Sequence, residues 1–257
     1  MYHLAVCFAV ALLCTGCRAG SVNRHLKLLP ELDNSIESNG FPTKHSAARS
    51  FLSLSKRPRA SQAHVAGSVL ALTCEALGAP APRVRWLKNA KPVYEHDSES
   101  TEQIDSNPSS LARVSSTLLV TRTEDTDEYT CIASSGKKVA RASTLVYSTG
   151  TAPDMTERSK LLPFAPHILV SYKAFVDTIG NNVILPCRAK GHPRPHMTWR
   201  DNNGTVVKKD NRMKVLKSGE LVISSLRWSD MGEWTCHATN TFGTQTASTF
   251  LYPALAG

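Results

Sequence analysis

The sequence predicts an all-β protein in which two tandem, disulfide-bonded β-sandwiches follow a signal peptide and a flexible N-terminal arm. Two observations support this fold class. The chain of 257 residues contains an internal repeat, in which a cysteine precedes a tryptophan by twelve residues and a second cysteine follows. Segments of each repeat alternate apolar and polar residues, as half-buried strands do. Once a leader is removed, about 100 residues remain for each sandwich, which is the usual size of such a domain.

The N-terminus has the pattern of a removable secretion signal. An apolar run from Leu4 to Leu13 is shorter than a membrane-spanning helix, and residues 17–19 place small side chains at positions −3 and −1 of a cut after Ala19. A buried helix is the alternative interpretation. We therefore predict a signal peptide at residues 1–19 and a secreted protein. No apolar run of about 18 residues follows, so we expect no membrane span.

Removal of the leader leaves four cysteines, an even number that in a secreted chain indicates disulfides rather than zinc. The two cysteines of each repeat are 57 and 49 residues apart. The repeat residues are Cys74, Trp86 and Cys131, then Cys187, Trp199 and Cys236. This order is typical of immunoglobulin-like (I-set type) sandwiches, in which the tryptophan packs over the disulfide. We predict that each repeat closes its own bridge, Cys74–Cys131 and Cys187–Cys236.

Each repeat departs from the usual pattern at one position. Trp234 stands where a tyrosine usually makes a corner hydrogen bond, so the geometry of that corner is open. Asp127 stands where glycine is common in the first repeat.

Composition divides the rest of the chain. Residues 20–59 are rich in Ser, Asn, Pro and basic residues, and are predicted to be a flexible basic arm. The first domain is predicted at residues 60–148, a linker at 149–165 and the second domain at 166–257.

Charge is unevenly distributed along the chain, whose formal net charge is +9. The second domain carries 11 basic and 6 acidic residues, and five basic residues cluster in one hairpin region: Lys208, Lys209, Arg212, Lys214 and Lys217. A heparan-type polysaccharide is a possible partner for them, and a solvated strand face is the alternative.

The first domain has an acidic segment, interpreted as an inter-strand loop, that contains Glu95, Asp97, Glu99, Glu102 and Asp105. Asn203-Gly204-Thr205 is a sequon for N-glycosylation in a turn sequence.

No motif for catalysis, metal binding or a cofactor is recognisable. The nine histidines are scattered, and His237, next to Cys236, is expected to point away from the core. No Ser, His and Asp are placed as nucleophile, base and orienting group. We therefore predict a binding protein without cofactor or metal rather than an enzyme, and expect no nucleic-acid partner because the chain is secreted.

The C-terminal third resembles a known family. The run from Leu216 to Pro253, with Trp228-Ser229-Asp230-Met231-Gly232 and an ending in Tyr252-Pro253, resembles the insect neural/ectodermal development factor family. The arm segment Leu32–Glu37 is also similar. The resemblance implies an ecdysone-inducible, secreted protein of two immunoglobulin domains. It also implies that the protein sequesters insulin-like peptides in the haemolymph and so antagonises insulin receptor signalling and growth. A secreted adhesion or guidance protein and a heparan-binding matrix protein are the alternatives.

The family defines no short binding motif, so contact residues are hypotheses from physical chemistry. Insulin-like hormones present an apolar face, for which an apolar patch or an unpaired sheet edge would be the complement. Trp228 is expected to be either a plug at the edge of the core or an exposed interface anchor. An exposed first strand of the second domain is the other candidate, formed by Ile168, Leu169, Val170, Ser171 and Tyr172. Homodimerisation is possible.

Overall fold

Residues 50–93, 107–149 and 163–255 are described by the structure, which is a computed structural model. Burial alternates along its strands. In β6 (Leu111–Val120), Ala112, Val114 and Leu118 are buried, whereas Arg113 is exposed. Because successive side chains of a strand point to opposite faces, this alternation gives the strand one core face and one solvent face.

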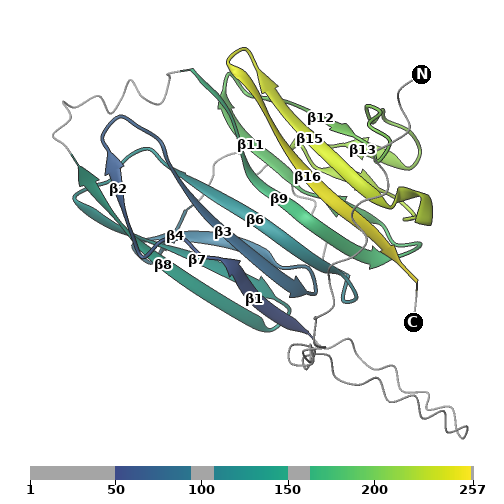
Figure 1. The fold of residues 1–257 in the computed structure, drawn as a ribbon, viewed down its shortest axis with the longest axis horizontal. Coiled ribbons are helices and arrows are strands. Elements are labelled where there is room, and N and C mark those ends of the chain that lie inside the picture. The colour runs from purple at the N-terminus through teal and green to yellow at the C-terminus, as the bar shows by residue number, and fades with distance from the viewer. Residues whose placement is uncertain (1–49, 94–106, 150–162, 256–257) are drawn as a thin grey trace, which may run out of the picture. The chain divides into compact units, whose positions relative to one another are not determined.

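The first domain is a sandwich of two sheets (Figure 1). Strands β1, β3 and β6 form one layer, and the other has the order β2-β8-β7-β4-β5. The remaining bounds are β1 (Phe51–Lys56), β2 (Ser61–Val65), β3 (Leu70–Ala79), β4 (Arg83–Lys88), β5 (Lys91–Pro92), β7 (Thr126–Ser135) and β8 (Lys138–Thr149). The core between the layers contains Leu72, Trp86, Leu118, Tyr129 and Val146.

The second domain is also a two-layered sandwich. A three-stranded sheet with the order β10-β14-β13 packs against the layer that contains β9, β16, β15 and β12. The bounds are β9 (Phe164–Thr178), β10 (Val183–Leu185), β11 (Cys187–His192), β12 (His196–Arg200), β13 (Met213–Val215), β14 (Leu221–Ile223), the short 3₁₀ helix η2 (Trp228–Asp230), β15 (Gly232–Asn240) and β16 (Gly243–Ala254). Two sandwiches of this kind confirm the predicted all-β fold class.

Strand β9 joins the two domains because it is paired along both of its edges. One edge pairs antiparallel with β6 of the first domain, from Leu111 opposite Val176 to Ser116 opposite Val170. Along its other edge, β9 pairs with β11 and then in parallel with β16. The result is an eight-stranded sheet with the order β1-β3-β6-β9-β16-β15-β12, in which β11 also pairs with β9 (Figure 1).

Both predicted disulfides are present, and each lies in the core of its own domain. The bridges are Cys74–Cys131 and Cys187–Cys236. The core tryptophans also find hydrogen-bond partners: the Nε1 of Trp86 donates to Ser116 Oγ (3.1 Å), and that of Trp199 donates to the Gly219 carbonyl (2.8 Å). These bonds fix the rings where the sequence predicted them.

The two departures from the usual repeat pattern have local explanations. The Nε1 of Trp234 donates to the carbonyl of Asp230 (2.8 Å), so the indole makes the corner hydrogen bond that was in doubt. The Asp127 carboxylate accepts from Asn89 (2.8 Å) and lies 3.0 Å from the Lys88 ammonium. It also accepts from the backbone N–H of Glu124. Glycine could supply none of these contacts.

Two predicted boundaries are corrected by the strands. The basic arm was expected to extend to Arg59, but Phe51–Lys56 forms β1 because its backbone pairs with β3 from Ala79 to Glu75. The linker was expected to end at residue 165, but β9 begins at Phe164. The predicted signal peptide, the rest of the arm, the acidic segment at 95–105 and most of the linker lie outside the described residues.

Candidate interaction surface

The solvent face of the eight-stranded sheet carries one row of apolar side chains that crosses the strands, and beside it a second row that mixes apolar and charged residues. In one row, Phe51 pairs with Ala79 on β3, and Leu111 pairs with Val176, which pairs with Tyr252. These residues alternate with core residues, so their side chains lie on the opposite face of the sheet.

The second row lies two residues away along each strand. It also crosses from the first domain to the second. Leu77 pairs with Arg113, Arg113 with Ala174, Ala174 with Phe250, and Phe250 with Glu233. The backbone pairing of β6 with β9 therefore sets the spacing of side chains from both domains.

Aromatic residues of the second domain form the most exposed part of this face. Phe250 is 49% exposed, Tyr252 41% and Trp228 52%. The Trp228 ring, from η2, meets the edge of the Tyr252 ring at 6.0 Å between centroids and 75° between planes. Trp228 is therefore exposed and is not a plug at the edge of the core; its role as an interface anchor stays a prediction. We call this surface the apolar band, made of Phe51, Leu77, Leu111, Val176, Trp228, Phe250 and Tyr252.

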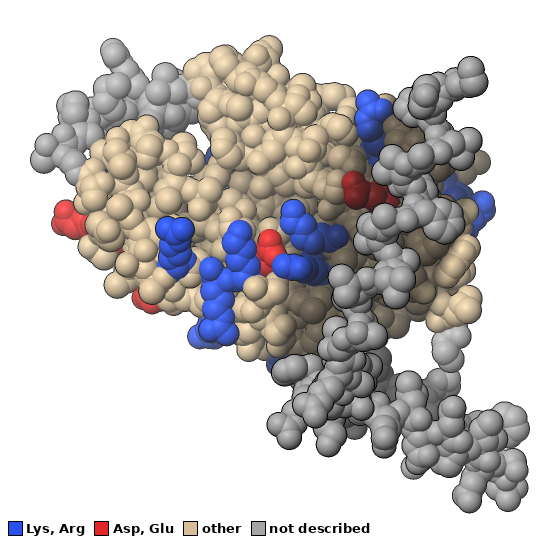
Figure 2. Space-filling view, viewed as in Figure 1, with Lys and Arg blue, Asp and Glu red and all other residues tan. Residues whose placement is uncertain are grey.

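A partly exposed ion pair lies beside the apolar band. The Arg113 guanidinium donates to the Glu75 carboxylate through Nη2 (2.8 Å) and Nε (3.2 Å). Glu75 is only 9% exposed, whereas the Arg113 side chain is 46% exposed, so the arginine is in contact with solvent. Figure 2 shows Lys and Arg side chains gathered around an acidic one on one face of the protein, within a largely uncharged surface. This ion pair places charged groups next to the apolar side chains.

The predicted exposed first strand is wrong as a binding edge. Leu169 is 5% exposed, and the backbone of this segment is paired with β6 and β11. Tyr172 stacks on Phe175 (5.1 Å, 2° between planes) and packs against core residues of both domains. Burial raises the pKa of Tyr172 to about 12. Ile168 and Val170 are half-buried against the same cores, so this segment joins the domains.

A run of consecutive apolar residues near the C-terminus could have indicated the apolar band from the sequence. Residues 249–253 read Thr-Phe-Leu-Tyr-Pro, so apolar residues occupy both alternating sets of positions. Leu251 is fully buried, whereas its neighbours Phe250 and Tyr252 are exposed. A strand that is apolar on both faces indicates either burial on both sides or an exposed binding face.

Comparison with known proteins identifies the family. Residues 53–135 match an immunoglobulin domain, and residues 166–252 match an immunoglobulin I-set domain. The neural/ectodermal development factor IMP-L2 of Drosophila melanogaster is 32% identical over 259 residues, which is 98% of this chain and 97% of that protein. This chain belongs to the neural/ectodermal development factor family. The resemblance found in residues 216–253 is thereby confirmed.

Two further likenesses agree with this assignment to the neural/ectodermal development factor family. The crystal structure of neural ectodermal development factor IMP-L2 is similar with a TM-score of 0.69 at 32% identity, covering 80% of this chain and 96% of that chain. The Zwei Ig domain protein zig-2 of Caenorhabditis elegans is 30% identical over 200 residues, or 74% of this chain and 80% of that protein.

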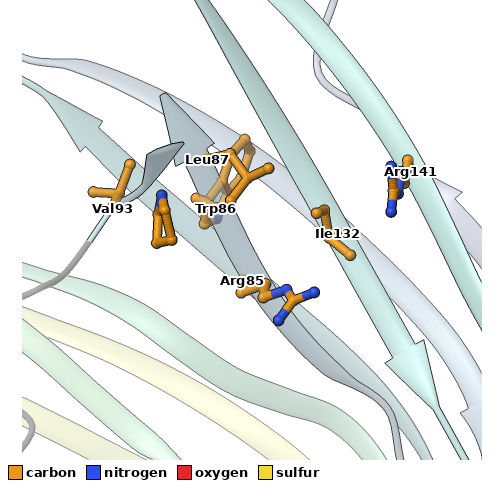
Figure 3. Close-up of a pocket in the computed structure, with 7 residues that line it drawn as sticks. Arg85, Trp86, Leu87, Val93, Ile132 and Arg141 are labelled. Atoms are coloured by element: carbon orange, nitrogen blue, oxygen red, sulfur yellow. The ribbon is translucent and has the colours of Figure 1, made fainter. Parts of the chain in front are cut away.

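This family member also has a pocket of about 490 Å³ on the first domain, away from the apolar band. It lies on the layer formed by β4, β5, β7 and β8, and Figure 3 shows Ile132 between the side chains of Arg85 and Arg141. Trp86, Leu87, Pro92 and Val93 complete the lining. The arginines flank an apolar floor, and no side chain that could act as a catalytic acid, base or nucleophile lines it.

The turn with the glycosylation sequon lies next to η2, because the Asn202 Nδ2 donates to the carbonyls of Ser229 (2.9 Å) and Met231 (2.8 Å). Asn203 is exposed in the turn after β12, where the Asp201 carboxylate accepts from the backbone N–H of Asn203 (3.0 Å) and Thr205 (2.7 Å).

Within the described ranges, no group of three His, Cys, Asp or Glu side chains could hold a metal ion. No helix in the same part of the chain is long and apolar enough to cross a membrane.

Proposed function

We propose that this protein is a secreted, non-enzymatic binding protein that holds an insulin-like peptide on the apolar band. In the haemolymph it would withhold the peptide from the insulin receptor and so restrain growth. The single observation that carries the proposal is the row of apolar side chains that crosses both domains on one sheet. Family membership supports the proposal, because resemblance to this family implies that the protein sequesters insulin-like peptides. Two disulfides suit an oxidising, extracellular compartment.

The chemistry of the apolar band matches the ligand class. Exposed Trp, Tyr and Phe side chains supply large contact areas at low entropic cost, and such residues dominate binding energy at interfaces. Because β6 and β9 are hydrogen-bonded, the two halves of the band are already aligned. A preorganised surface loses less conformational freedom on binding, which favours tight capture of an apolar hormone face.

The proposal is tested by substituting the most exposed aromatic residues. We expect Phe250→Asp with Tyr252→Asp to weaken binding of insulin or of a synthetic insect insulin-like peptide at least about 30-fold, since a hot spot contributes about 2 kcal/mol or more. Isothermal titration calorimetry measures this, with circular dichroism to confirm folding. Val139→Asp is the matched control, because Val139 is 56% exposed on β8, outside the band.

The outcomes separate the function from its site. Failure of the folded wild-type protein to bind either peptide would overturn the proposed function. Wild-type binding that the double substitution leaves unchanged would place the ligand elsewhere. Concentration-dependent self-association lost in the double variant, without peptide binding, would favour the adhesion alternative.

A further inference from the structure

The second domain presents an excess of basic charge to solvent. It contains 11 basic and 6 acidic residues, but three of the acids, Asp177, Glu220 and Asp230, are buried. Glu220 is held by Arg188 at 3.1 Å and Asp230 by Arg212 at 2.6 Å. Setting these two ion pairs aside removes two charges of each sign and leaves 9 basic and 4 acidic residues, so the domain keeps an excess of five positive charges.

Basic side chains lie on β13 and on the turns beside it. Lys214 is the central residue of β13, and it points outward because Met213 and Val215 pack against the core. Lys217 lies in the turn after β13, where the Arg194 Nη2 donates to its carbonyl (3.4 Å). This bond links the turn between β11 and β12 to the turn between β13 and β14.

Exposed lysines on either side extend this group. Lys190 is at the end of β11, next to the turn that carries Arg194, and Lys208 and Lys209 precede β13. We call the group the basic surface: Lys190, Arg194, Lys208, Lys209, Lys214 and Lys217. Asp210 is the acid next to it in sequence, and its carboxylate accepts from the backbone N–H groups of Arg212 and Met213. These bonds lower the pKa of Asp210 and anchor the carboxylate in its own turn.

The part of the basic surface around β13 is separate from the apolar band, whereas Lys190 lies on β11, which pairs with β9 of the eight-stranded sheet. β13 is the edge strand of the three-stranded sheet, which is the opposite layer of the sandwich from β16 and β15. A ligand on Phe250 and Tyr252 would therefore leave Lys214 and Lys217 accessible.

We propose that the basic surface binds a sulfated polysaccharide of the heparan type. Its groups are mostly lysines on turns and a strand edge rather than a pocket, which suits a flexible, highly charged polymer more than a compact ligand. An anionic membrane surface is the competing polyanion, and vesicles are therefore included in the experiment below. Extracellular retention of the protein would then depend on a surface that peptide binding does not use.

The test measures binding to immobilised heparin by surface plasmon resonance over a range of NaCl concentrations. The full-length protein is compared with a triple variant, Lys208→Gln, Lys214→Gln and Lys217→Gln. The matched control is Lys137→Gln, Lys138→Gln and Arg141→Gln, exposed residues of the first domain that remove the same charge. We expect the triple variant to lose at least about tenfold in affinity near 0.15 M NaCl. The slope of log affinity against log NaCl should fall by about three, whereas the control should change little.

Other results would overturn the proposal. Equal losses in both triple variants would mean that net charge alone draws the protein to heparin. Absence of binding near 0.15 M NaCl, or stronger binding to phosphatidylserine vesicles than to heparin, would contradict a polysaccharide site. An unchanged affinity of the triple variant for an insulin-like peptide is expected, because the part of the basic surface around β13 is separate from the apolar band. A loss of both affinities would contradict that separation.

Discussion

At the scale of single residues, Asp127 shows how a departure from a repeat pattern is stabilised. Burial opposes ionisation of its carboxyl group, but hydrogen bonds from Lys88, Asn89 and the Glu124 backbone outweigh this effect and lower its pKa below the usual 3.8. A group whose pKa is lowered by folding stabilises the fold when it is ionised, and this contribution is lost as the pH falls through the folded pKa.

We therefore predict that Asp127→Asn destabilises the first domain by about 1–3 kcal/mol near neutral pH, because the charged hydrogen bonds are lost. The difference from wild type should shrink as the pH falls below 3.8 and through the lower folded pKa, where the native carboxyl group becomes protonated. Urea unfolding at several pH values measures both effects. Asp125→Asn is the control, since Asp125 is exposed in the same turn. A difference that does not change with pH would contradict the assigned role.

Asn203 is a second residue whose chemistry depends on local geometry. An exposed asparagine in a turn is accessible to the glycosylation machinery, and Thr205 two residues later completes the sequon. We propose that the protein secreted from insect cells carries an N-linked glycan there. Mass spectrometry should show a mass that falls after peptide N-glycosidase treatment and that Asn203→Gln removes. An unmodified Asn203 in the secreted protein would disprove this.

At the scale of elements, β9 serves both domains. Its first half pairs with β11, its second half with β16, and its outer edge with β6, so its residues contact two cores. Tyr172 is opposite Val114 of the first domain in this pairing and stacks on Phe175 of the second. Sequence periodicity indicated a strand here, but a strand's own residues do not specify its neighbours.

We predict that Tyr172→Ala costs about 3 kcal/mol, because a large ring is removed from a packed joint. The loss should also uncouple the domains. Calorimetry is expected to show one unfolding transition for wild type and two for the variant. Tyr147→Ala is the control, as Tyr147 is 43% exposed on β8. Two transitions in the wild-type protein would show that β9 does not couple the domains.

At the scale of the whole molecule, the described residues divide their surface chemistry between layers. The eight-stranded sheet presents the apolar band, and the opposite layer of the second domain presents the β13 part of the basic surface, with Lys214 and Lys217. Of the hairpin cluster noted from the sequence, Arg212 is held by Asp230, whereas Lys208, Lys209, Lys214 and Lys217 are exposed. The proposed peptide and polysaccharide sites are compatible for this reason.

The sequence by itself determined the two sandwiches, both disulfides and the positions of Trp86 and Trp199. These features follow from the local alternation of apolar and polar residues and from the spacing of the cysteines. Both can be read from the amino-acid sequence alone. Only the tertiary structure decided that β6 pairs with β9, that Tyr172 is buried, and that Phe51 and Tyr252 share one face. Strand pairing between domains depends on which strand edges come together in space. The residue pattern of one strand does not specify its partner in the other domain.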